Sequence, residues 1–194
     1  LHPNDGLPIA PSPIKPTGKV YTASWTLAEY ETPRAITLDE IQTLKTQYVH
    51  AATQAKAAGF DGIELHAANG YLLDQFLQDR TNQRTDAYGG SIENRCKLVL
   101  EILEDIIPIW GSGRVGIRLS PYGTFSDMGD SDPVGLFSYL INALNRFNLA
   151  YLHLIEPRAT TAGGNDQLVA DAPRTGQLFR QLFTGKVVLA GGFD

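Results

Sequence analysis

The chain has 194 residues and a formal net charge of −5, from 16 basic and 21 acidic side chains. Its length suits one domain, and its 43% hydrophobic and 19% charged residues exclude an intrinsically disordered protein. The acidic balance offers no electrostatic footprint for nucleic acid or an anionic membrane surface, so we expect neither partner. A single cysteine, Cys96, excludes an internal disulfide. We expect no signal peptide or membrane span and therefore a cytoplasmic protein.

Residues 1–36 differ from the rest of the chain. Prolines at positions 3, 8, 11, 13, 16 and 33 interrupt any regular pattern, so we expect an irregular loop with room for a short hairpin. From residue 37 onward, amphipathic helical patterns alternate with short apolar runs, which predicts parallel α/β architecture over residues 37–194.

The first helix is expected to begin after Thr37, where Glu40 completes a capping box, and to end at Gly59 with Ala51 on its apolar face. Three more helices are expected: one stopping at Pro108, one starting at Asp132–Pro133, and one over 173–183. The expected strands are residues 60–66, 114–119, 149–155 and 186–190, and a polar loop is expected between the first strand and Gly90.

Polar side chains recur at the strand ends. Because side chains alternate between two faces of a strand, the apolar residues are expected to face the helices. Parallel α/β proteins place their active sites at the carboxyl ends of the strands. The polar side chains that we expect to gather there are His66, Arg118, Ser120, His153 and Glu156.

The loop after the first strand carries three hydrogen-bonding side chains around Gly70. His66 and Asn69 can both donate to one carbonyl oxygen and stabilise negative charge on it. Tyr71, protonated at neutral pH, can act as a proton donor. The structural alternative is that all three side chains satisfy loop backbone groups.

Other polar residues have both functional and structural interpretations. Arg118 on the inward face needs an anionic or electron-rich partner, and an ion pair with Glu64 or Glu156 is the structural alternative. Gly191 and Gly192 expose backbone donors suited to a phosphate, or simply form a tight turn. Metal ligation by His66, His153 and Glu156 fits no standard spacing. The charged segment 80–95 is expected to be a solvated loop with a helix cap.

Six segments carry long and specific motifs that span nearly the whole chain. They are residues 32–35, 59–77, 82–95, 115–121, 151–158 and 190–194. Together they resemble the old yellow enzyme family, in the branch that contains 12-oxophytodienoate reductase and N-ethylmaleimide reductase.

The resemblance implies an FMN-dependent (β/α)8 TIM barrel that passes hydride from NAD(P)H to the β-carbon of an α,β-unsaturated carbonyl compound. It implies that His66 and Asn69 bind the substrate carbonyl oxygen and that Tyr71 protonates the α-carbon. Arg118 matches an arginine beside the flavin pyrimidine edge, where positive charge stabilises the reduced cofactor. Gly191 and Gly192 match a loop around the FMN phosphate.

A full barrel of that family has eight strands, and this chain matches strands four to seven, truncated before strand eight. We therefore expect residues 1–36 to follow barrel strand three. We also expect the isolated chain to be inactive, as a segment of a longer protein or as a half-barrel that forms a homo-oligomer or pairs with a complementary half. The alternatives are a catalytically inactive assembly or scaffold element and, more remotely, a metal-dependent lyase or hydrolase.

Overall fold

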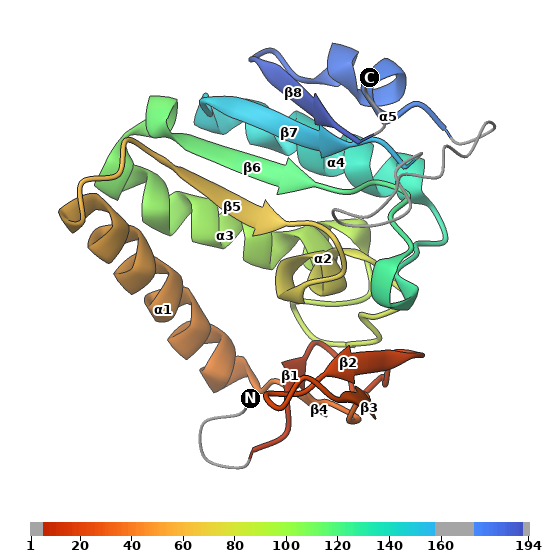
Figure 1. The fold of residues 1–194 in the computed structure, drawn as a ribbon. Helices are drawn as coiled ribbons and strands as arrows, with labels where there is room; N and C mark the ends of the chain where they lie inside the picture. The colour runs from red at the N-terminus through yellow and green to blue at the C-terminus, as the bar shows by residue number, and fades with distance from the viewer. Residues whose placement is uncertain (1–5, 158–172, 192–194) are drawn as a thin grey trace.

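A parallel sheet of four strands forms the centre of the computed structural model, which describes residues 6–157 and 173–191 (Figure 1). The strands follow one another across the sheet in chain order, β5-β6-β7-β8, and every neighbouring pair is parallel. Their bounds are Ile63–Ala67, Val115–Leu119, Tyr151–Ile155 and Val187–Ala190. All four carboxyl ends therefore lie along one edge of the sheet.

Helices connect the strands, and α3 and α4 lie together along one face of the sheet (Figure 1). The α-helices α1 to α5 are Leu38–Ala57, Leu72–Leu77, Ile92–Trp110, Pro133–Leu144 and Thr175–Phe179. The 3-10 turns η1 to η4 are Ser112–Arg114, Phe125–Asp127, Asn145–Phe147 and Arg180–Leu182. Within the described part of the chain, no helix has the length and apolarity needed to cross a bilayer.

The two faces of the sheet differ, as strand alternation predicts. The core packs between the helices and one face, and the sheet residues buried there are Leu65, Ile117, Leu119, Leu152 and Leu154. On the other face, the side chains of Glu64, His66, Arg118 and His153 are only half-buried. The helix-facing side thus stabilises the fold, and the other side carries the polar groups.

The N-terminal segment forms two small sheets beside the amino-terminal end of α1 (Figure 1). Strands β1 (Ile9–Ala10) and β4 (Arg34–Ala35) pair in parallel, and β2 (Lys19–Tyr21) and β3 (Leu27–Glu29) form an antiparallel hairpin. Arg84 binds this segment to the loop after α2, because its guanidinium donates to the carbonyl oxygens of Pro11 and Ile36 at 3.0 and 2.7 Å.

The capping box at the start of α1 is confirmed: Glu40 N donates to Thr37 Oγ1, and Thr37 N donates to the Glu40 carboxylate. The expected apolar position of Ala51 is wrong, since Ala51 is exposed and Ala52 is buried. The carbonyl oxygen of Ala52 accepts from Trp110 Nε1 at 3.0 Å, which fixes the face that α1 turns toward α3.

Two expected boundaries are also wrong. Helix α3 continues through Pro108 to Trp110, because a proline in the last turn removes one hydrogen bond while Gly111 N still donates to Ile107 O at 2.8 Å. The first strand begins at Ile63 and not at residue 60. Phe60 is 65% exposed, and its N–H donates to Ala55 O, so it is tied to the end of α1 and precedes β5.

Candidate active site

Three polar side chains lie in one row across the sheet. The register pairs His66 on β5 with Arg118 on β6, and Arg118 with His153 on β7. All three are half-buried. The row lies near the carboxyl ends of these strands, where the sequence predicts a site.

Arg118 forms no ion pair with a carboxylate among the described residues, so the structural alternative for this side chain is wrong. Glu64 instead accepts from His153 Nδ1 at 2.9 Å. Among the described residues, the buried Nε of Arg118 and the buried Nε2 of His153 have no hydrogen-bond partner. Buried polar atoms without partners are costly, so the row fits a ligand that supplies polar atoms to both side chains.

Glu156 does not join this row, which corrects the expected grouping. It lies an even number of residues from Leu152 and Leu154, so alternation places it on the helix side of the sheet. Its buried carboxylate accepts from the backbone N–H groups of Thr175 and Gly176 at the start of α5, both at 2.9 Å. Glu156 therefore anchors α5.

The metal interpretation of His66, His153 and Glu156 finds no geometric support, because Glu156 lies on the other face. Among residues 6–157 and 173–191, no three histidine, cysteine or acidic side chains are grouped so that they could hold a metal ion.

The turn after β5 brings the next candidates together. Asn69 and Gly70 both have left-handed backbone conformations, with φ of 57° and 74°. A side chain on Gly70 would come within 2.7 Å of the carbonyl oxygen of Phe125, so this position requires glycine. The turn leads directly into α2, and Tyr71 occupies its N-cap position.

His66 and Tyr71 face each other across this turn, with ring centroids 5.5 Å apart. Tyr71 is 58% exposed, whereas His66 is partly buried. Burial and the nearby positive charge of Arg118 lower the pKa of His66. A neutral imidazole still carries one N–H, so His66 can donate a hydrogen bond without bearing a charge.

Ser120 follows β6, an even number of residues from Arg118, and it is buried beneath the turn. Its hydroxyl accepts from the backbone N–H of Asn69 at 2.7 Å. The turn that carries Asn69 is thereby tied to the end of the neighbouring strand.

Gly191 follows β8 with φ of 100°, a left-handed conformation that glycine adopts easily. Gly192, the second residue of the expected phosphate loop, lies outside the described residues.

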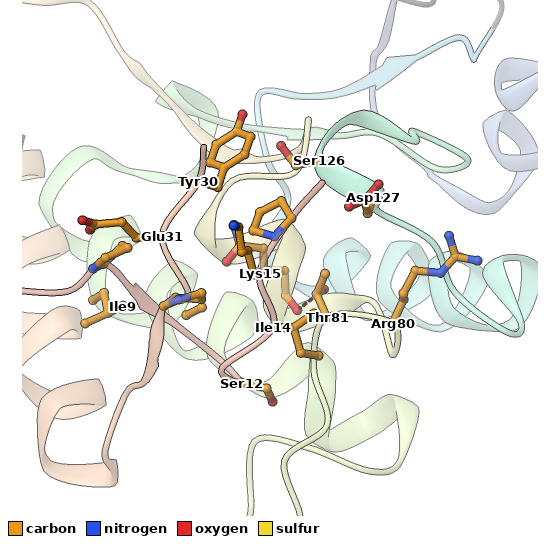
Figure 2. A pocket seen from close by; sticks show the side chains of 15 residues that line it. Ile9, Ser12, Ile14, Lys15, Tyr30, Glu31, Arg80, Thr81, Ser126 and Asp127 are labelled. Carbon is orange, nitrogen blue, oxygen red and sulfur yellow. Dashed lines mark hydrogen bonds between the residues drawn. The ribbon is translucent and has the colours of Figure 1, made fainter. Parts of the chain in front are cut away.

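A pocket of about 200 Å³ lies between the N-terminal segment and the loops after α2 and around η2 (Figure 2). Its lining includes Ile14 and Lys15 from the first segment, Thr81 after α2, and Ser126 in η2. The predicted site residues are not among those that line it, so this pocket is separate from the polar row.

Two features of the chain between β5 and α3 were not expected from the sequence. The expected polar loop contains helix α2, with the fully buried Asp74 inside it. The segment 80–95 is only partly a solvated loop, since Asn82 and Arg95 are buried. Arg95 pairs with Asp130 at 3.0 Å, and Asn82 donates to two carbonyl oxygens. A single acid among the leucines and the phenylalanine of residues 72–77 was the available signal for Asp74.

Relatives of known sequence cover the whole chain. It is 40% identical over 194 residues to putative 12-oxophytodienoate reductase 11 of Oryza sativa subsp. japonica, covering 100% of this chain and 52% of that protein. It is 42% identical over 166 residues to 12-oxophytodienoate reductase 2 of Arabidopsis thaliana, covering 86% of this chain and 43% of that protein. The chain thus spans about half the length of these relatives.

Solved structures share the fold. The old yellow enzyme homologue from Zymomonas mobilis matches with a TM-score of 0.88 and 36% identity, over 97% of this chain and 52% of that one. Morphinone reductase in complex with tetrahydroNAD matches with a TM-score of 0.86 and 40% identity, over 99% of this chain and 51% of that one. The expected barrel class is confirmed, with this chain covering about half of each barrel.

The model of the NADH:flavin oxidoreductase / NADH oxidase family matches residues 3–194. The sequence motifs, the parallel sheet and the family model therefore agree that this chain belongs to the NADH:flavin oxidoreductase / NADH oxidase family.

Proposed function

We propose that the protein carrying this chain is an FMN-dependent ene-reductase, which passes hydride from NAD(P)H through the flavin to the β-carbon of an α,β-unsaturated carbonyl compound. The observation that carries the proposal is Arg118, whose buried Nε has no hydrogen-bond partner among the described residues. It lies in one row with His66, next to the turn that bears Asn69 and Tyr71. The family match and the reductase relatives support it.

The residues of the polar face fit a flavin. A flavin ring offers several polar atoms, and the buried Nε of Arg118 and Nε2 of His153 both lack partners. The fixed positive charge of Arg118 would stabilise the anionic reduced ring, and Gly191 with Gly192 would donate backbone N–H groups to its phosphate. When bound, FMN would accept hydride from NAD(P)H and pass it to the substrate.

His66 and Asn69 would bind the substrate carbonyl oxygen. Hydride addition at the β-carbon moves an electron pair toward this oxygen, which gains negative charge in the transition state. Two donors that bind the oxygen more strongly as it becomes charged accelerate this step. The lowered pKa of His66 keeps its imidazole neutral at pH 7, so it acts as a hydrogen-bond donor.

Tyr71 would complete the reaction by donating its hydroxyl proton to the α-carbon of the enolate. The product has then gained a hydride at the β-carbon and a proton at the α-carbon, and the tyrosine oxygen regains a proton from water. Its 58% exposure leaves the side chain open to solvent for that return. The exposed position beside His66 thus suits a residue that both meets substrate and exchanges protons.

Substitution of Tyr71 tests this assignment. We expect Tyr71→Phe to leave bleaching of the bound flavin by NADPH or NADH unchanged, and to slow its reoxidation by cyclohexenone about 100-fold or more. Stopped-flow absorbance separates these two half-reactions. Tyr21→Phe is a matched control, since Tyr21 is also exposed (64%) but lies on the hairpin.

Unchanged reoxidation in Tyr71→Phe would refute the role of proton donor. A protein that retains no flavin, or whose flavin is bleached by neither nucleotide, would refute the proposed function as a whole. No observation of this structure favours the scaffold alternative.

A further inference from the structure

Asp74 is the centre of a buried hydrogen-bond network under the turn that follows β5. Its side chain is fully buried in α2. Oδ2 accepts from Gly70 N at 2.9 Å and from Ser120 Oγ at 3.1 Å, and Oδ1 accepts from Gln78 Nε2 at 2.8 Å. Both carboxylate oxygens are therefore satisfied by donors from three different segments.

Ser120 extends the network to Asn69. Its hydroxyl donates to Asp74 and at the same time accepts from Asn69 N at 2.7 Å. The backbone N–H groups of both left-handed residues of the turn thus end on the same network. The Asn69 N–H reaches Asp74 through Ser120, and the Gly70 N–H reaches it directly.

The network also supports the backbone of Asn69, which has a left-handed conformation although it is not a glycine. A left-handed conformation is sparsely populated by residues with a side chain and persists where surrounding contacts enforce it. The backbone conformation sets the direction in which the Asn69 side chain leaves the chain. Whatever fixes the two N–H groups therefore also fixes the direction of the Cα–Cβ bond from which the amide of Asn69 extends.

We propose that Asp74 and Ser120 are positioning residues that hold the amide of Asn69 where it and His66 can donate to one substrate oxygen. The proposal rests on the proposed function, which places Asn69 at the carbonyl oxygen. Neither Asp74 nor Ser120 touches substrate in this scheme, and both act through the turn.

The electrostatic cost of the network agrees with such a role. Burial raises the pKa of Asp74 to about 6, although the bonds from Gln78, Gly70 and Ser120 each act in the opposite direction. A buried carboxylate is expensive, and a neutral group could fill the same space. What the side chain of Asp74 supplies is one oxygen that accepts from both the turn and Ser120, and any replacement must keep that acceptor.

A double-mutant cycle tests the proposal on the flavin-loaded protein. We expect Asp74→Ala and Ser120→Ala each to slow reoxidation of the reduced flavin by cyclohexenone about 10-fold or more, while reduction by NADPH stays within about twofold. In an Asn69→Ala background, Asp74→Ala should cost less than about threefold, because residues that act through one group are not additive.

Conservative replacement provides the rescue. Asp74→Asn retains an oxygen acceptor for Gly70 and Ser120, and the Gln78 amide can turn to accept from the new amide, so we expect reoxidation within about threefold of the unmodified protein. Ser12→Ala is the matched control. Ser12 is another buried serine whose hydroxyl accepts a backbone N–H, from Gln83 at 2.9 Å, but it lies on the N-terminal segment.

Amide hydrogen exchange gives a readout that does not depend on turnover. We expect exchange at Asn69 and Gly70 to accelerate in Ser120→Ala and to stay slow in Asp74→Asn and Ser12→Ala. If Asp74→Ala does not fold, Ser120→Ala and Asp74→Asn still decide the matter.

Two results would overturn the proposal, and they are distinguishable. Additive losses from Asn69→Ala and Asp74→Ala, or unchanged reoxidation in Ser120→Ala, would show that the network does not act through Asn69 and would leave the proposed function intact. Normal reoxidation in Asn69→Ala itself would remove both the carbonyl-binding role of Asn69 and the reason to position it.

Discussion

The two faces of the four-stranded sheet are built from alternate residues of the same strands, yet they differ in almost every property. Leu152 and Leu154 on β7 are fully buried against the helices, while His153 between them is half-buried and has a nitrogen without a partner. Apolar burial stabilises the native state in proportion to the area removed from water. Buried polar atoms without hydrogen-bond partners destabilise it.

This difference indicates that alternate residues of each strand have different roles. The helix-facing residues hold the sheet together, and the residues that alternate with them keep polar atoms available for a ligand. Functional sites commonly retain such locally unfavourable groups, because the rest of the fold supplies the stability. Substitutions on the two faces should therefore have separable effects on stability and on chemistry.

The largest expected effect is on the helix-facing side. Leu152→Ala removes a wholly buried side chain and should lower the free energy of unfolding by about 2–5 kcal/mol, from lost burial and the cavity left behind. Val188→Ala is the control, because Val188 is 43% exposed on β8 and should cost less than about 1 kcal/mol. Denaturant unfolding measures both, and equal costs would contradict the division between buried and open positions.

Asp74 departs from this pattern, because its side chain is fully buried and yet ionisable. Its pKa in the folded protein is raised to about 6 from an ordinary value of 3.8, so the folded state holds the proton more tightly than the unfolded state. The contribution of Asp74 to the free energy of unfolding is therefore fully present below about pH 4 and is lost as the pH rises through about 6. A pKa difference of this size corresponds to about 3 kcal/mol, so Asp74→Asn should raise the free energy of unfolding by up to that amount at pH 7.

Unfolding at pH 4 and pH 7 checks this sign. The variant should differ little from the unmodified protein at pH 4 and be more stable at pH 7. A variant that is less stable at pH 7 would show that the hydrogen bonds to the carboxylate outweigh its desolvation.

Much of this architecture could be predicted from local patterns. Periodicity and caps located four of the helices, and alternation placed His66, Arg118 and His153 on one face. The error with Glu156 came from extending that face beyond the strand without counting residues. The exposed Ala51 shows a different limit: which alanine of a helix is buried depends on a tertiary partner, here the indole of Trp110.

The network under the turn could not be predicted in the same way. Asp74, Ser120 and Asn69 come from three segments, and only the fold brings Ser120 beneath a turn some 50 residues earlier in the chain. The six-residue helix α2 is also too short for a clear period. Long-range polar contacts therefore limit what the sequence shows of the candidate site.

On the polar face of the sheet, Arg118→Gln tests whether the positive charge of Arg118 affects the reduction potential of the flavin. Loss of a positive charge beside a flavin should make its two-electron reduction potential more negative by about 30 mV or more, which corresponds to about 1.4 kcal/mol. The free energy of unfolding should change much less than in Leu152→Ala. Arg146→Gln is the control, since Arg146 pairs with Glu104 at the protein surface.

The smallest expected effect is that of Arg118→Gln on the pKa of His66. The charge of Arg118 lowers the pKa of His66 together with burial, while Glu64 acts in the opposite direction. Removing that charge should therefore raise the pKa of His66, which NMR titration of the imidazole can follow without any turnover. Because burial remains the larger cause, the pKa should stay below its ordinary value. An unchanged pKa would show that the two side chains do not share one electrostatic environment, and the row across β5 and β6 would then not act as a single site.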